Sequence, residues 1–76
     1  MKELLYYIVK ALVDHPEAIS INEIEREGEL VLELTVDPSD MGKVIGRQGR
    51  IAKAIRTLVK TAAVRENLRV SVDILG

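Results

Sequence analysis

The sequence contains no cysteine, phenylalanine or tryptophan, and it has a single histidine among its 76 residues. The lack of cysteine excludes disulfides and thiolate metal sites, and one histidine excludes a zinc site built on several imidazoles. No apolar run reaches the ~18 residues that a membrane-spanning helix needs, and the first residues do not have the pattern of a secretory signal. These absences predict a cytoplasmic protein with no metal, no cofactor and no place in the membrane.

The residues that are present are mainly aliphatic. Hydrophobic residues make up 47% of the chain, and most of them are leucine, isoleucine or valine. A chain of this length buries only roughly 60% of the surface that its unfolded form exposes, so its core must be dense. The length leaves room for one domain, which we expect to span residues 1–76.

Charge is distributed unevenly along the chain, although the net charge is only −1. Residues 1–40 carry three basic and ten acidic side chains, a net charge of −7, whereas residues 41–65 carry seven basic and no acidic ones. A solvated face normally mixes both signs. Binding to a polyanion depends on the local field, so the acid-free block favours a nucleic-acid partner despite an isoelectric point of about 5.8.

The hydrophobic pattern changes period along the chain and indicates six elements. The step from Ile21 to Ile24 breaks the two-residue period and predicts a bulge or an early strand end. Asp37 can cap a helix, and a proline follows it at the first helical position. The pattern predicts a helix over residues 2–14, strands over 18–25 and 30–36, a short helix from Asp37 to Gly46, a long helix over 49–65 and a strand over 69–75.

This order favours an α+β fold with a three-stranded mixed sheet and helices on one face. The first two strands are expected to form an antiparallel hairpin through a turn at residues 27–29, and the last strand to follow a right-handed parallel crossover. On the long helix, a basic stripe is predicted to lie beside a buried one. The basic stripe is Arg50, Lys53, Arg56 and Lys60; the buried stripe is Ile51, Ala54, Ile55, Leu58, Val59 and Ala62.

The segment Val44–Ile51, with sequence VIGRQGRI, lies at the junction of the two C-terminal helices. Gly46 and Gly49 leave the backbone bare, and the free N–H groups at the start of the next helix favour a phosphate. Lys43, Arg47 and Arg50 add cations near this point. A helix C-cap followed by a tight turn would also explain two glycines, but the flanking basic pattern favours a clamp for a sugar-phosphate backbone.

This segment resembles the Gly-x-x-Gly core of a KH domain, and the element order looks like the type II, bacterial form of that fold. The whole chain is similar to the small stand-alone bacterial KH proteins of the KhpA (YlqC-like) group. The resemblance implies a non-catalytic protein that binds single-stranded RNA, holding its backbone at the Gly-x-x-Gly loop and its bases on an aliphatic groove. It also implies a role as an RNA chaperone or post-transcriptional regulator. Pairing with itself or with another KH protein of the Jag/KhpB type is implied as well.

Carried onto this chain, the resemblance and the charge pattern together name the expected RNA contacts. The two glycines would allow close approach, Arg47 and Gln48 would make loop-tip contacts, and the two isoleucines would form the apolar floor. Lys60 and Arg65 are interpreted as ordinary surface. The full set of expected contacts is Lys43, Ile45, Gly46, Arg47, Gln48, Gly49, Arg50, Ile51 and Lys53.

Two other classes of function compete with RNA binding. A protein-interaction module could keep this fold for dimer or partner assembly alone, but assembly does not require the basic block. An enzyme is not expected, because the chain has no cysteine nucleophile, no evident Ser–His–Asp/Glu set and no phosphate-loop lysine signature. Tyr6 and Tyr7 are adjacent on a helix, so one is expected to pack and the other to be exposed.

Overall fold

The structure is a computed structural model that describes residues 1–75. The order of its elements is the predicted one, with three short 3₁₀ turns inserted at Pro16–Ala18, Pro38–Asp40 and Arg47–Gly49. The helices and strands are α1 (Lys2–Lys10), β1 (Ser20–Arg26), β2 (Glu29–Thr35), α2 (Met41–Ile45), α3 (Arg50–Arg65) and β3 (Val70–Ile74).

The three strands form one mixed sheet in the order β1-β2-β3, which confirms the predicted topology. β1 and β2 are antiparallel, and β2 and β3 are parallel. The predicted bulge near Ile24 is wrong: the pairing runs without a break from Ser20 opposite Thr35 to Arg26 opposite Glu29. Ile24 lies opposite Val31 on the face of the sheet away from Ile21, so the step between the two isoleucines reflects a change of face.

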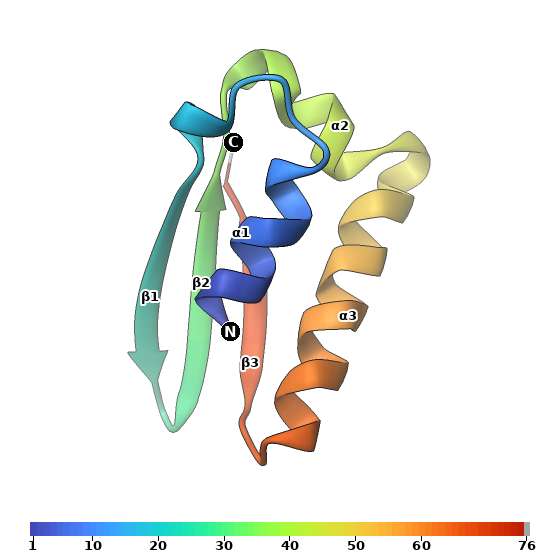
Figure 1. Ribbon diagram of the computed structural model, residues 1–76. Coiled ribbons are helices and arrows are strands. Elements are labelled where there is room, and N and C mark those ends of the chain that lie inside the picture. The colour runs from blue at the N-terminus through green and yellow to red at the C-terminus, as the bar shows by residue number, and fades with distance from the viewer. Residues whose placement is uncertain (76) are drawn as a thin grey trace.

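Helices α1 and α3 lie side by side on one face of the sheet, and α2 lies near the end of β2, as Figure 1 shows. The core forms between these helices and the sheet, and it is aliphatic, as predicted. Its fully buried large apolar side chains come from α1, α2 and α3 and from the central strand: Leu5, Val9, Leu32, Leu34, Val44, Ile55 and Val59.

The buried stripe of α3 differs from the predicted one. Ala52, Ile55, Val59 and Ala63 are buried, whereas Leu58 is 55% exposed. Ile51 and Ala54 are exposed too. Leu58 lies beside a hollow between α3 and α1, which is lined on the α1 side by Leu4 and Ile8. The nine-residue α1 therefore does not cover this side of α3 completely.

Helix α1 ends at Lys10, several residues before the predicted end near Asp14. The chain beyond it is held by a distant carboxylate. Asp40, which is fully buried, accepts hydrogen bonds from the N–H groups of Asp14 at 3.2 Å and His15 at 3.0 Å. These groups thus have partners outside the helix, and a contact 25 residues away in sequence decides how the segment continues.

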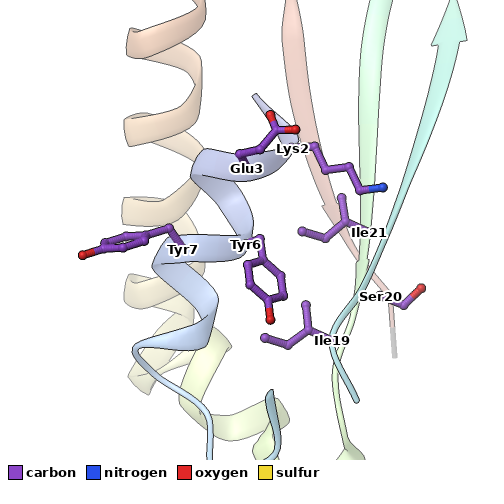
Figure 2. Close-up of a pocket in the computed structure, with 7 residues that line it drawn as sticks. All are labelled: Lys2, Glu3, Tyr6, Tyr7, Ile19, Ser20 and Ile21. Carbon is purple, nitrogen blue, oxygen red and sulfur yellow. The ribbon is translucent and has the colours of Figure 1, made fainter. Parts of the chain in front are cut away.

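The two tyrosines of α1 point in different directions (Figure 2), but the expectation that one of them packs is not met, because Tyr6 is still 40% exposed. The ring of Tyr6 lies over Ile19, beside a hollow of about 550 Å³ between α1 and the start of β1. Tyr7 points away from that strand and is 76% exposed. α1 therefore presents an aromatic ring to solvent on its outer side.

Candidate nucleic-acid interface

The loop between α2 and α3 begins at a glycine that the packing requires. Gly46 ends α2, and its N–H donates to the carbonyl of Gly42 at 2.9 Å. Its backbone has φ 74° and ψ 178°, a conformation open essentially to glycine alone. A Cβ at this position would lie 2.6 Å from Cγ1 of Ile51. The missing side chain therefore lets Ile51 fold back against the end of α2.

The tip of the loop is exposed and turns through left-handed backbone. Gln48 has φ 56° and ψ 25°, and Gly49 has φ 72° and ψ 15°. A Cβ on Gly49 would have no atom within 4 Å, in contrast to one on Gly46. Arg47 and Gln48 are both exposed, and Nη2 of Arg50 donates to Oε1 of Gln48 at 3.3 Å. Polar side chains and open backbone thus meet at the start of α3.

Lys43 lies on α2 but is committed to the fold. Its ammonium group forms an ion pair with Asp14 and lies 3.4 Å from Oδ1 of Asp40. The bond to Asp14 raises the pKa of Lys43; partial burial opposes this rise, and Asp40 adds to it. Two carboxylates therefore compensate the charge of Lys43, unlike that of Arg47 at the loop tip.

Asp40 is the buried partner of this ion pair. Burial alone would raise the pKa of Asp40, but the N–H groups of Asp14 and His15, together with Lys43, outweigh it and lower the pKa. The carboxylate is therefore ionised at neutral pH, and it joins the chain after α1 to α2. In the sequence, Asp40 looks only like an acidic residue near the start of a helix. Nothing in the sequence predicts its hydrogen bonds to the chain after α1.

The predicted contacts divide between two sides of α3. With about 100° per residue, Ile51 falls on the side that carries Leu58 and faces α1, whereas Lys53 falls on the opposite side. Ile45 and Ile51 are each 37% exposed, so they provide some apolar surface next to the loop. The structure thus brings the glycines, Arg47, Gln48, Arg50 and the two isoleucines together around the loop, while Lys53 belongs to a different surface.

That second surface is a basic row on the side of α3 that faces β3. It consists of Lys53, Arg56 and Lys60, and we call it the basic row. The guanidinium of Arg56 donates through Nε to the backbone carbonyl of Val72 at 3.3 Å. Sequence reasoning placed Arg56 on a basic stripe but did not predict this contact, because the helical period does not show which neighbour a stripe faces.

Two kinds of feature are absent from the described part of the chain. Within residues 1–75, no group of three or more acidic, histidine or cysteine side chains is placed to hold a metal ion. None of the helices in this range is both long and apolar enough to cross a bilayer.

Comparison with known proteins identifies what this arrangement is similar to. The family model described as "KhpA/KhpB, KH domain" matches residues 2–74 of this chain. An RNA-binding protein KhpA of Clostridium perfringens is 60% identical over 75 residues, 99% of this chain and 100% of the relative. The protein of that name from Clostridium acetobutylicum is 59% identical with the same coverage, and the one from Chlamydia muridarum is 49% identical over 99% of this chain and 96% of its own.

Proposed function

This chain belongs to the KhpA/KhpB family of KH domains, and we propose that it is a non-catalytic protein that binds single-stranded RNA. The relatives are named for binding RNA, and no catalysed reaction appears in their names. We infer that residues 1–76 act as a single KH module. In this proposal the protein works in the cytoplasm as an RNA chaperone or post-transcriptional regulator.

The observation that carries the proposal is the exposed loop from Gly46 to Gly49 at the start of an acid-free basic helix. Gly49 lies in open space, so a sugar-phosphate backbone can approach the main chain there. Arg47 and Arg50 supply cations, and Gln48 supplies an amide at the tip. Ile45 and Ile51 offer the apolar surface beside it. The N–H groups of Gly49 and Arg50 already donate to the carbonyls of Gly46 and Arg47, so the start of α3 favours the same anion through its positive dipole end.

The electrostatics of the site define how RNA binding should depend on salt. Lys43 is compensated by Asp14 and Asp40, so it contributes less than its position suggests. With Arg47 and Arg50 at the loop and Lys53 on the neighbouring basic row as the main cations, about three phosphates are neutralised. The log–log slope of the association constant against salt should then be about −2 for a single strand, with micromolar affinity typical of a small module.

The test replaces both loop-tip side chains. Changing Arg47→Asp and Gln48→Asp puts two carboxylates where phosphate must lie, and it should abolish binding of a short single-stranded RNA in an anisotropy assay. A matched control, Arg26→Asp with Asn22→Asp, changes the charge by the same amount on the face of the sheet away from the helices. Both variants should keep the circular dichroism of the wild type, because all four positions are exposed.

Two results would contradict the proposal. One is equal affinity of the loop variant and the wild type; the other is equal loss of affinity in the control variant, which would indicate a net-charge effect. A preference for duplex RNA over a single strand would contradict the backbone clamp as well, because the loop is proposed to hold a strand with accessible bases.

We further propose that the protein pairs with itself or with another KH protein of the Jag/KhpB type. One small footprint gives little affinity, and joining two sites can raise avidity by ~10²–10⁴. The apolar hollow between α1 and α3, with Leu4, Ile8 and the exposed Leu58, is a suitable surface for the pairing. Sedimentation at tens of micromolar should show a dimer that Leu58→Glu disrupts and Val64→Glu, an exposed control on α3, leaves intact. A wild type that sediments as a monomer, alone and with a KhpB-type protein, would refute the pairing.

A further inference from the structure

Within residues 1–75, the outer edge of β1 is a row of main-chain groups that no other strand covers. β1 lies at one end of the sheet and pairs with β2 alone, as Figure 1 shows. It is seven residues long, which is enough for a further strand to pair with it. A free edge of this kind can accept an extended segment of another chain, because its N–H and C=O groups are oriented for one more ladder.

The hydrogen bonds of β2 determine which residues of β1 face this edge. The N–H of Leu30 donates to the carbonyl of Arg69 in the segment before β3. The carbonyl of Leu34 accepts from the N–H of Leu75 beyond β3, so the even-numbered residues of β2 turn toward that strand. Successive residues of a strand turn their main-chain groups to opposite sides, so the odd-numbered residues of β2 bond to the even-numbered residues of β1. The residues left for the free edge are Ile21, Glu23 and Glu25.

These same residues point their side chains to the face of the sheet that carries the helices. Ile21 belongs to the core, and Glu23 and Glu25 follow it on that face at two-residue spacing. Both glutamates are exposed, and neither forms an ion pair within the described residues. A strand added to this edge would therefore place its own side chains beside two uncompensated carboxylates.

A hollow adjoins the start of the same edge. It has a volume of about 550 Å³ and lies between α1 and the start of β1. The ring of Tyr6 and the side chains of Ile19 and Ile21 give it apolar walls, and Lys2 and Glu3 also line it (Figure 2). A side chain opposite Ile21 on an added strand would enter this hollow. The hollow therefore suits one aliphatic side chain.

The two glutamates determine which strand the edge accepts. Full antiparallel overlap of two β1 edges would place Glu23 opposite Glu23 of the other copy, and like charges directly opposite one another are destabilising. Basic residues at these positions would instead form two cross-strand ion pairs. Edge glutamates also protect a sheet from aggregation, but that role does not require an apolar hollow beside them. The edge thus disfavours a second copy and suits a basic strand.

We propose that the edge of β1 binds a basic, extended segment of another protein by strand addition. Antiparallel pairing is the more stable geometry per residue, and it determines the order of the segment. From its N-terminus, the segment has basic residues opposite Glu25 and Glu23 and then an aliphatic residue opposite Ile21. This surface is separate from the loop proposed to hold RNA, and it lies on the other side of α1 from the hollow between α1 and α3.

The probe is a peptide with blocked ends and the sequence Thr-Lys-Thr-Lys-Thr-Ile-Thr. In a titration of isotope-labelled protein it should bind saturably, with the largest amide shifts at Ile21, Glu23 and Glu25. A peptide of the same composition with adjacent lysines cannot place both of them on the side of the glutamates. It should bind about threefold more weakly or worse, because a cross-strand charge pair contributes a factor of that order.

Charge reversal tests the two ion pairs. Glu23→Lys with Glu25→Lys turns two attractions into repulsions and should weaken peptide binding at least about tenfold. The matched control, Glu66→Lys with Asp73→Lys, changes the net charge by the same amount at exposed positions outside β1. Its affinity should stay within about threefold of the wild type, since exposed charges at a distance are screened by salt.

A proline variant tests the main-chain pairing. Glu23→Ala removes one charge and should weaken binding only a few fold. Glu23→Pro also removes an N–H that faces the free edge and should abolish binding, while the ladder to β2 keeps its hydrogen bonds. Circular dichroism checks the fold of both variants. If the proline variant does not fold, hydrogen exchange in the wild type decides, because the bound peptide should slow exchange of the N–H groups of Glu23 and Glu25.

Four outcomes would overturn the proposal. They are no binding of the probe at millimolar concentration, equal affinity for the two peptides, equal affinity of the charge-reversed and control variants, and equal affinity of the alanine and proline variants. A wild-type dimer in sedimentation that Glu23→Pro dissociates would show that a second copy occupies the edge instead. None of these results bears on RNA binding at the loop.

Discussion

The two ends of the loop between α2 and α3 are built in opposite ways. On the α2 side, Lys43 is held by two carboxylates, and a Cβ on Gly46 would overlap Ile51. On the α3 side, Gln48 and Gly49 have left-handed backbone, and Gly49 lies in open space. Packing determines the first end, whereas only backbone conformation restricts the second. One end thus anchors the loop in the fold and leaves the other accessible to a ligand.

Gly46→Ala should break the anchored end and have the largest effect. Its backbone region is open essentially to glycine and costs about 1–3 kcal/mol for other residues. Overpacking against Ile51 adds about 1–3 kcal/mol. We therefore expect chemical denaturation to show a loss of about 3 kcal/mol or more in the free energy of unfolding.

A double-mutant cycle with Ile51→Ala would sharpen that result. Removing Cγ1 and Cδ1 of Ile51 takes away two of the three atoms that the new Cβ would meet, although Cβ of Ile51 remains at 2.9 Å. The combined variant should therefore lose less stability than the sum of the two single losses. Simple additivity would show that the γ and δ carbons of Ile51 do not contribute to the requirement for glycine.

Asp40→Asn tests the other anchor of the α2 side and should lower the melting temperature by less than Gly46→Ala. The change keeps an acceptor for Asp14 or His15 but removes the charge opposite Lys43. Because folding lowers the pKa of Asp40, its stabilisation is complete above the ordinary value of 3.8 and is lost as pH falls through the lowered pKa. The difference in melting temperature between wild type and variant should be largest at neutral pH and shrink below pH 3.8.

The comparison of the wild type with Asp40→Asn also contains an internal control. Asp37, whose pKa is lowered by the hydrogen bond from the N–H of Ser39, loses stabilising interactions in the same pH range. Asp37 is present in both proteins, so its contribution cancels in the difference. A difference that did not change with pH would show that the charge of Asp40 is unimportant to the anchor.

Much of the fold could be predicted because local signals agree with it. Asp37 was expected to begin a helix, and its Oδ1 accepts a hydrogen bond from the N–H of Ser39 at 2.9 Å. The two-residue period over residues 30–36 predicted a strand, and β2 forms there with Leu32 and Leu34 fully buried. Gly46 ends α2 as predicted. Each of these features depends on neighbours within a few residues, which a single sequence displays.

The missed features depend on residues that meet only after folding. Lys43 looked like a free cation, but its partner Asp14 is 29 residues away in the chain. Arg56 meets Val72 across the gap between α3 and β3, and periodicity cannot show that meeting. Leu58 was predicted to be buried because it fits the apolar stripe, yet α1 does not cover it fully. Local patterns specify the elements, and their relative placement decides the site.

Gly49→Ala should have the smallest effect on stability and a larger one on RNA binding. Left-handed backbone costs about 1–2 kcal/mol for an ordinary residue, and the stiffer unfolded chain offsets about 0.4–1 kcal/mol of this. The net loss should be about 1 kcal/mol, with no clash because the new Cβ meets no atom within 4 Å. Gly49→Asn should lose less, since asparagine tolerates this backbone. Both side chains would occupy the space proposed for the RNA backbone, so both variants should bind RNA more weakly although Asn keeps the fold more stable. If affinity followed stability instead, with Asn binding nearly as well as glycine, the open end of the loop would not be the place where RNA approaches.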